Sequence, residues 1–237
     1  GMDKPAFKAL AREHGVATLP ELVITQSEWS SDREGLLRAI AAFANEHTST
    51  GALIGKPAAH GSSIGMKIAH TSADWADAVD EALRFGDRAM LEPYLERARE
   101  LEVAVLERTD GTVQAFGPGE VFPGREFYDY DAKYAPGVSR TTTSSDLPAA
   151  LADEMRAAAV ALFAAAQSRG LARMDFLMAR SGERAGRWYL SEVNTFPGFT
   201  PISLFPALVM SGGASFTQLC VELVAAAAAR PAPRSTR

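Results

Sequence analysis

Two short segments near the end of the sequence combine charged and amide side chains in a spacing suited to metal binding. Arg173 and Asp175 are two residues apart, and so are Glu192 and Asn194. On a β-strand, residues two apart lie on the same face, because successive side chains alternate. If the two segments form a hairpin that closes symmetrically about residues 183–184, Asp175 lies directly opposite Glu192.

Two carboxylates facing each other across a strand pair repel unless a positive group lies between them. Mg²⁺ is the natural candidate, since carboxylate and amide oxygens are the ligands it takes in proteins. The spacing therefore predicts Asp175, Glu192 and Asn194 as metal ligands. The alternative is a solvated sheet face on which Arg173 neutralises one of the acids.

A second candidate site is the glycine-rich turn Gly61–Gly65, which follows Lys56 within a few residues. Backbone N–H groups in such a turn approach an anion closely, and a lysine adds a point charge. The turn lacks the spacing of a nucleotide-binding P-loop. It fits Gly-x-Ser-x-Gly of serine hydrolases, but those enzymes need a histidine well downstream, and the last of the four histidines is His70. An anion-binding turn is favoured, with an ordinary surface turn as the alternative.

Four further segments carry groups that could do chemistry. Glu92–Leu95 reads as a hinge, and Glu100 and Glu102 share a strand face. The segment Phe127–Tyr134 holds three tyrosines and Lys133, which suits either a lid over a phosphate or an anchor to the core. The turn Asn194–Pro201 offers backbone N–H groups for an oxyanion.

Composition limits the class of protein. The chain has 237 residues, 47% of them hydrophobic, and a net charge of −5 without a Lys/Arg block, which excludes a disordered chain and argues against nucleic-acid and membrane partners. The single Cys220 rules out an intrachain disulfide and a cysteine-based zinc site, as expected for a cytoplasmic protein. The longest apolar stretch, Val221–Ala229, is well short of the ~20 residues that span a bilayer.

Helical and alternating patterns set out the elements that must position these groups. The first helix is expected to bury Phe7, Leu10, Ala11 and His14. Helices are predicted at Pro5–Gly15, Ser31–Ala44, Thr71–Phe85, Ala149–Ser168 and Ser215–Ala229. Strands are predicted at Leu19–Thr25, Ala52–Pro57, Met66–Ala69, Ala89–Leu95, Leu101–Glu107, Val113–Phe116, Ala172–Ala179 and Arg187–Asn194. This order predicts an α+β protein of two lobes.

Taken in order, these motifs resemble the D-alanine–D-alanine ligases of the ATP-grasp superfamily, from Met2 to about Val224. The matching segments are Lys56-Pro57, Gly61–Gly65, Phe127–Tyr134, Arg173–Asp175 and Glu192–Gly198. The resemblance implies an ATP-grasp fold, in which two α+β lobes hold ATP between antiparallel sheets. It divides the chain into a small lobe at 2–92, a large lobe at 93–230 and a flexible tail at 231–237.

The resemblance also implies roles for individual residues. ATP would be bound by Lys4, Lys56 and Lys133 on the phosphates, Glu92 and the backbones of Pro93 and Leu95 on the adenine, and Glu100 on the ribose. Two Mg²⁺ ions, for which Mn²⁺ could substitute, would be held by Asp175, Glu192 and Asn194. The D-alanines would be oriented by Ser62 and Tyr134, the tetrahedral oxyanion stabilised by Arg173 and the Gly198 N–H, and the second carboxylate bound by Ser203 and the Leu204 backbone.

The implied activity is ATP- and Mg²⁺-dependent joining of two D-alanines through a D-alanyl phosphate, for peptidoglycan synthesis. The tyrosine-bearing segment resembles dipeptide-forming enzymes more than D-lactate-using ones, and the family suggests a homodimer. Family members carry an N-terminal domain before the helix at Met2-Asp3-Lys4, and these 237 residues do not include it. Two alternatives therefore stay open: a non-catalytic nucleotide-binding module, and an ATP-grasp ligase for another amino acid.

Overall fold

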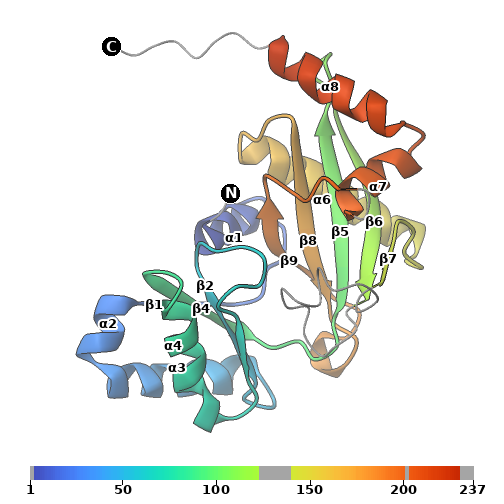
Figure 1. The fold of residues 1–237 in the computed structure, drawn as a ribbon. Coiled ribbons are helices and arrows are strands. Elements are labelled where there is room, and N and C mark those ends of the chain that lie inside the picture. Colours follow the sequence, from blue (N-terminus) through green and yellow to red (C-terminus); the bar gives the residue numbers. More distant parts are fainter. Residues whose placement is uncertain (1–2, 123–139, 201–202, 230–237) are drawn as a thin grey trace, which may run out of the picture. The chain divides into compact units, whose positions relative to one another are not determined.

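The structure, a computed structural model, describes residues 3–122, 140–200 and 203–229 (Figure 1). The described residues form two compact units. The first contains those of Gly1–Glu100, Val121–Arg140 and Phe176–Glu192, and the second contains those of Leu101–Glu120, Thr141–Asp175 and Val193–Arg237. The fold class is α+β, as the sequence predicts, with two sheets and helices packed on them.

The first unit contains a four-stranded antiparallel sheet in the order β1-β4-β2-β3. Its strands are β1 (Leu22–Thr25), β2 (Leu53–Pro57), β3 (Lys67–Ala69) and β4 (Arg88–Pro93). Ile54 pairs with Glu92, so Lys56, two residues further along β2, lies on the same face as Glu92. The register alone thus brings a lysine and a glutamate of the predicted nucleotide site together.

Helices of the first unit supply its core. They are α1 (Lys4–Glu13), α2 (Gln26–Ser31), α3 (Arg33–His47), the 3₁₀ turn η1 (Ser72–Asp74) and α4 (Trp75–Leu83). Fully buried Ile40 of α3 and Val79 of α4 meet Ile24, Leu53 and Leu91 of the strands. This cluster fixes the sheet that carries Lys56 and Glu92.

A charged cluster on the surface of this core ties α4 to α3 and α2. Both guanidinium NH groups of Arg33 donate to Asp80, at 3.0 and 2.6 Å, and the Trp29 Nε1–H donates to it at 2.7 Å. The hydrogen bonds from Arg33 are the main cause that lowers the pKa of Asp80 below its usual value. Asp80 is therefore held in its ionised form.

We expect Asp80→Asn to reduce the amount by which the free energy of unfolding falls at acidic pH. Because the folded pKa lies below the unfolded value of about 3.9, the Asp80 contribution is present above that pH and is lost as the pH falls through the folded pKa. The pair is partly exposed to solvent, so the effect is expected to stay below about 1 kcal/mol. Urea unfolding from about pH 6 to pH 3 measures it; an equal acid loss in both proteins contradicts the assignment.

The second sheet has the order β7-β6-β5-β8-β9. Its strands are β5 (Arg99–Glu107), β6 (Val113–Phe122), β7 (Arg140–Thr142), β8 (Leu171–Met178) and β9 (Trp188–Asn194). The predicted Asp110-Gly111 hairpin turn between β5 and β6 is present: Gly111 has φ +82°, and the Asp110 carboxylate accepts from the Thr112 N–H at 2.9 Å. The turn η2 (Gly182–Arg184) lies between β8 and β9.

Helices α6 (Ala149–Ala165), α7 (Leu204–Ser211) and α8 (Phe216–Ala228) belong to the second unit. In the view of Figure 1, α6 passes behind β5 and β6, and α7 lies in front of them. A Cβ on Gly119 of β6 would lie 3.0 Å from Leu208 of α7, so the strand and helix are closely packed. Within the described residues, no single helix has the length and apolar character to cross a membrane; α7 and α8 pass that test only as a pair bent by 101°.

Candidate active site

Lys4 is held beside the loop that follows β2. Its backbone N–H donates to the Ala58 carbonyl at 2.8 Å, and its ammonium group donates to the His60 carbonyl. The Nζ atom also lies 3.3 Å from Oε2 of Glu192, in β9. The structure thus brings a predicted phosphate ligand into contact with a predicted metal ligand.

The glycine-rich turn adopts a backbone that few residues tolerate. Ser62 and Ser63 both have φ +57°, in the left-handed region where a residue other than glycine is strained. Gly65 has φ +70°, and a Cβ there would lie 2.6 Å from the Phe85 ring and 2.8 Å from Pro57. Strained backbone of this kind is common in ligand-binding loops. Ser62 is exposed to solvent in this turn.

Lys56 and Glu92 form a buried ion pair, with Nζ 2.5 Å from Oε2. The lysine offsets the negative charge of Oε2. Because Oε2 accepts no hydrogen bond of good geometry, it can still accept one from a ligand. Burial is the largest single influence on the Glu92 carboxyl and would raise its pKa, but the charges and hydrogen bonds of Lys56 and Lys8 together outweigh it. The pKa of Glu92 is therefore lowered, and the group is ionised.

Lys8 contacts the same carboxylate, although it is not among the residues singled out from the sequence. Its side chain is fully buried, and its ammonium group bonds to Oε1 of Glu92 and lies 3.1 Å from Glu21. Glu21 in turn accepts two hydrogen bonds from Arg12, at 2.9 and 2.7 Å. The contacts form a continuous chain of charges from α1 to β2.

The buried face of α1 also corrects a sequence prediction. The expected stripe included His14, but His14 is exposed and Leu10 is only half-buried. The residues that α1 buries are Lys4, Phe7, Lys8 and Ala11. The sequence signal for Lys8 was therefore available: it lies four residues after Lys4, on the helical spacing of Phe7 and Ala11.

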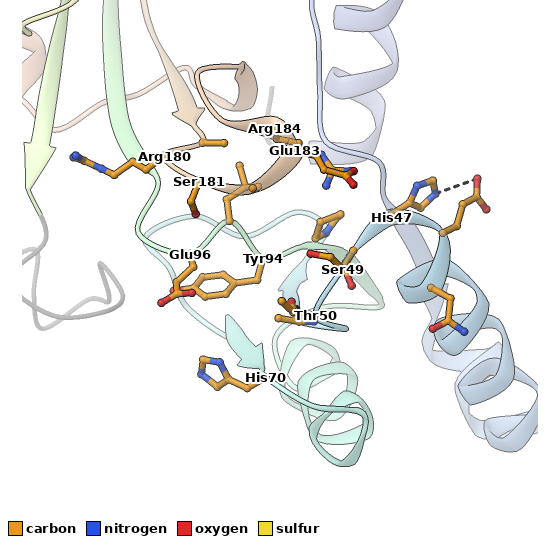
Figure 2. Close-up of a pocket in the computed structure, with 18 residues that line it drawn as sticks. His47, Ser49, Thr50, His70, Tyr94, Glu96, Arg180, Ser181, Glu183 and Arg184 are labelled. Carbon is orange, nitrogen blue, oxygen red and sulfur yellow. Dashed lines mark hydrogen bonds and ion pairs between the residues drawn. The ribbon is translucent and has the colours of Figure 1, made fainter.

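A pocket of about 610 Å³ opens beside the segment Pro93–Glu96 (Figure 2). Pro93 and Leu95, the predicted adenine contacts, are part of its lining. Hinge residue Tyr94 is fixed by its N–H, which donates to the Ala52 carbonyl at 3.0 Å, and by an edge-on ring contact with His70. The rest of the lining comes from Asn45–Thr50 at the end of α3 and just after it, from Ala52 and His70, and from Ala179–Arg184 after β8. The pocket is large enough for a nucleobase with its sugar.

Arg173 and Asp175 are bound to each other rather than free for a ligand. The guanidinium group donates to both carboxylate oxygens of Asp175, at 2.6 and 2.7 Å, and its Nε lies 3.2 Å from Glu102. Neutralisation of one acid by Arg173 is therefore real, as the alternative interpretation of the strand face requires. Since a carboxylate has about four acceptor positions, Asp175 can still hold a cation.

The register between β8 and β9 differs from the symmetrical hairpin expected from the sequence. The Ala179 N–H donates to the Arg187 carbonyl at 3.0 Å, and the Gly186 N–H donates to the Ala179 carbonyl at 2.8 Å. Two residues of one strand thus face Ala179, which is a β-bulge, with Gly186 at φ +77°. The symmetrical register, which pairs Ala179 with Trp188, is therefore wrong at this end, because Ala179 bonds to Gly186 and Arg187 instead.

The turn after β9 brings Gly198, predicted to stabilise the oxyanion, next to Ser203, a predicted contact of the second carboxylate. A Cβ on Gly198 would lie 2.8 Å from Oγ of Ser203, so a larger residue there would require the Ser203 side chain to move. The Ser203 hydroxyl accepts from the Thr200 N–H at 3.0 Å, and Leu204 begins α7 directly after it. Asn194 accepts from the Phe196 N–H at 3.1 Å through Oδ1.

The donor set Asp175, Glu192 and Asn194 consists of oxygens alone, which fits Mg²⁺. The described residues contain no cluster of three or more His, Cys, Asp or Glu that could hold a metal, and this set contains only two such acids. Lys133 and Tyr134 lie outside the described residues.

The family model "D-ala D-ala ligase C-terminus" matches residues 10–225. The chain is 39% identical over 236 residues to a D-alanine--D-alanine ligase of Streptomyces coelicolor, covering 98% of this chain and 58% of that protein. A D-alanine--D-alanine ligase of Heliobacterium modesticaldum is 37% identical, with 94% and 58% covered.

Solved structures agree with these relatives. D-alanyl-alanine synthetase A from Vibrio cholerae superposes with a TM-score of 0.78 at 31% identity, covering 94% of this chain and 64% of that one. VanG D-Ala:D-Ser ligase from Enterococcus faecalis gives 0.77 at 25% identity, with 94% and 60% covered. The chain thus spans about 58% of the curated relatives' length.

Proposed function

This chain belongs to the D-alanine–D-alanine ligase family, with its ATP-grasp fold, and on that premise we propose that it binds ATP and Mg²⁺ and joins two D-alanines. One observation carries the nucleotide part of this proposal. Lys4 bonds through its ammonium group to the His60 carbonyl, and Lys56 directly precedes the segment 57–60, which leads into the strained turn Gly61–Gly65. Two cations around a turn of small residues suit a polyphosphate.

The residues have distinct proposed tasks. Lys4 and Lys56, with Lys133, bind the phosphates, and Glu92 accepts from the adenine amino group. Pro93 and Leu95 contact the base through their backbones, and Glu100 binds the ribose. Asp175, Glu192 and Asn194 hold Mg²⁺, which when bound offsets negative charge on the phosphates.

The proposed reaction has two steps. A carboxylate oxygen of the first D-alanine attacks the γ-phosphorus of ATP and ADP leaves, with Lys56 and Lys133 offsetting charge on the transferring group. The amine of the second D-alanine then attacks the acyl carbon, and phosphate departs as the amide forms and a proton is lost. Arg173 and the Gly198 N–H stabilise the oxyanion. Ser62 and Tyr134 orient the substrates, and Ser203 and the Leu204 backbone hold the second carboxylate.

The second substrate is the least constrained part of the proposal. The similarity to VanG, named a D-Ala:D-Ser ligase, favours D-serine as an alternative acceptor with the same reacting amine. D-lactate offers a hydroxyl instead. We expect the amine acceptors to be used.

The test is phosphate release from ATP and Mg²⁺ by this chain, with D-alanine present or absent. We expect release to depend on D-alanine, with D-alanyl-D-alanine detected by mass spectrometry and no release with L-alanine. ATP binding without D-alanine-dependent turnover would support a non-catalytic nucleotide-binding module. Product with D-serine alone, or ester alone from D-alanine plus D-lactate, would contradict the proposed acceptor.

A further inference from the structure

The charges in the chain of contacts from Arg12 to Lys56 do not balance. The chain of contacts contains three cations, Arg12, Lys8 and Lys56, and two anions, Glu21 and Glu92. Lys8 lies between the two anions and is fully buried, whereas the Arg12 side chain is 46% exposed. One positive charge is thus in surplus over the whole chain of contacts, and Lys8 is the cation of the three that is shielded most from solvent.

Lys8 is not needed to neutralise either acid. Without it, Glu21 keeps two hydrogen bonds from Arg12, and Glu92 keeps Lys56 at 2.5 Å. Each acid would still have one basic partner, and the chain of contacts would be neutral. Because burying an ammonium group is costly, an extra lysine here calls for an explanation other than pairing.

The contact between Lys8 and Glu92 changes how far Glu92 neutralises the charge of Lys56. With Glu92 bound by Lys56 alone, the two charges cancel, and a phosphate would meet a closed ion pair. With Lys8 bonded to Oε1 and Lys56 at Oε2, Glu92 is shared between two cations. Glu92 then offsets the charge of Lys56 only in part.

We infer that Lys8 is a positioning residue of the nucleotide site: by sharing the carboxylate of Glu92, it keeps the charge of Lys56 available to phosphate. This inference rests on the proposed function of Lys56. It assigns Lys8 no contact with the nucleotide, and its effect is specific to the phosphate end, since an uncharged nucleoside does not sense a surplus charge.

The test compares Kd values of ATP, inorganic tripolyphosphate and adenosine by calorimetry, in metal-free buffer, for the whole chain. We expect Lys8→Met to weaken ATP and tripolyphosphate on the order of tenfold and to leave adenosine unchanged. Lys8→Arg keeps the charge and should keep the affinity. Lys67→Met, which removes an exposed lysine from the same sheet, is the matched control.

A double variant distinguishes an effect of charge on phosphate binding from a general effect of the Lys8 substitution on the fold. Glu92→Gln in the Lys8→Met background removes the anion that would neutralise Lys56, so tripolyphosphate affinity should return. Equal loss for adenosine and tripolyphosphate, or no recovery in the double variant, would overturn the inference in favour of a structural role. If the wild-type chain binds neither ATP nor tripolyphosphate, the proposed function falls and this inference with it; if it binds both and Lys8→Met does too, only the inference falls.

Discussion

We expect Asp175→Asn and Glu192→Gln each to abolish the strengthening of ATP binding by Mg²⁺, a loss of more than about a hundredfold, because a neutral amide replaces a charged group proposed to bind a hard cation. Both changes preserve side-chain shape. The readout is the ratio of ATP Kd values with and without Mg²⁺. Glu154→Gln, on an exposed position of α6, is the matched control and should leave that ratio unchanged.

When no metal is present, the same two variants should not weaken ATP binding. Glu192 lies 3.3 Å from Lys4, and Asp175 accepts two hydrogen bonds from Arg173. Neutralising Glu192 removes a counter-charge from Lys4, and neutralising Asp175 removes one of the two acids beside Arg173, so metal-free ATP should bind as tightly as before or more tightly. Weaker binding under both conditions would indicate general disruption of the fold, and an undiminished response to Mg²⁺ would show that these acids are not the metal ligands.

Gly55→Ala destabilises the first unit by about 2 kcal/mol or more, since nothing there can move aside cheaply. A Cβ at position 55 of β2 would lie 2.6 Å from the Ala78 carbonyl oxygen and 3.1 Å from its Cβ, both on α4. The obstacle is helix backbone, so α4 would have to shift from the strand. The sheet that carries Lys56 would shift with it.

Urea unfolding measures this effect, read as a lower midpoint at an unchanged m-value. The control is Gly86→Ala: the nearest atom to a Cβ there is 3.7 Å away, in Pro57, and the cost should be within about 0.5 kcal/mol. A Gly55→Ala protein as stable as the Gly86→Ala protein would contradict the close packing of β2 on α4.

Much of the fold follows from local patterns, and the misses have physical causes. The α+β class and the Asp110-Gly111 hairpin are confirmed because turn chemistry and alternation act over a few residues. Helix α2 was missed because it has six residues and buries only Trp29, too little for a periodic signal. Helix α7 was missed because its buried side chains leave no polar face.

The candidate site shows the same limit more sharply. Lys56 and the strained turn could be found from spacing, because both belong to one short segment. The Lys8–Glu92 contact joins residues 84 apart in sequence, and no local pattern encodes such a pairing. The symmetrical register is wrong at Ala179 because a bulge at Gly186 interrupts the pairing there, and symmetry about the turn could not reveal a bulge.

The first unit combines segments that lie far apart in the sequence, and this affects how the chain folds during synthesis. Thr18 forms a parallel bridge with Leu190, and the Leu190 N–H donates to the Ala17 carbonyl at 2.9 Å. Translation from the N-terminus supplies one side of these bonds long before the other. The backbone groups of the segment between α1 and β1 therefore lack these partners until the strand with Leu190 leaves the ribosome. A nascent chain stalled before that point should remain protease-sensitive around Thr18, however complete its first four strands are.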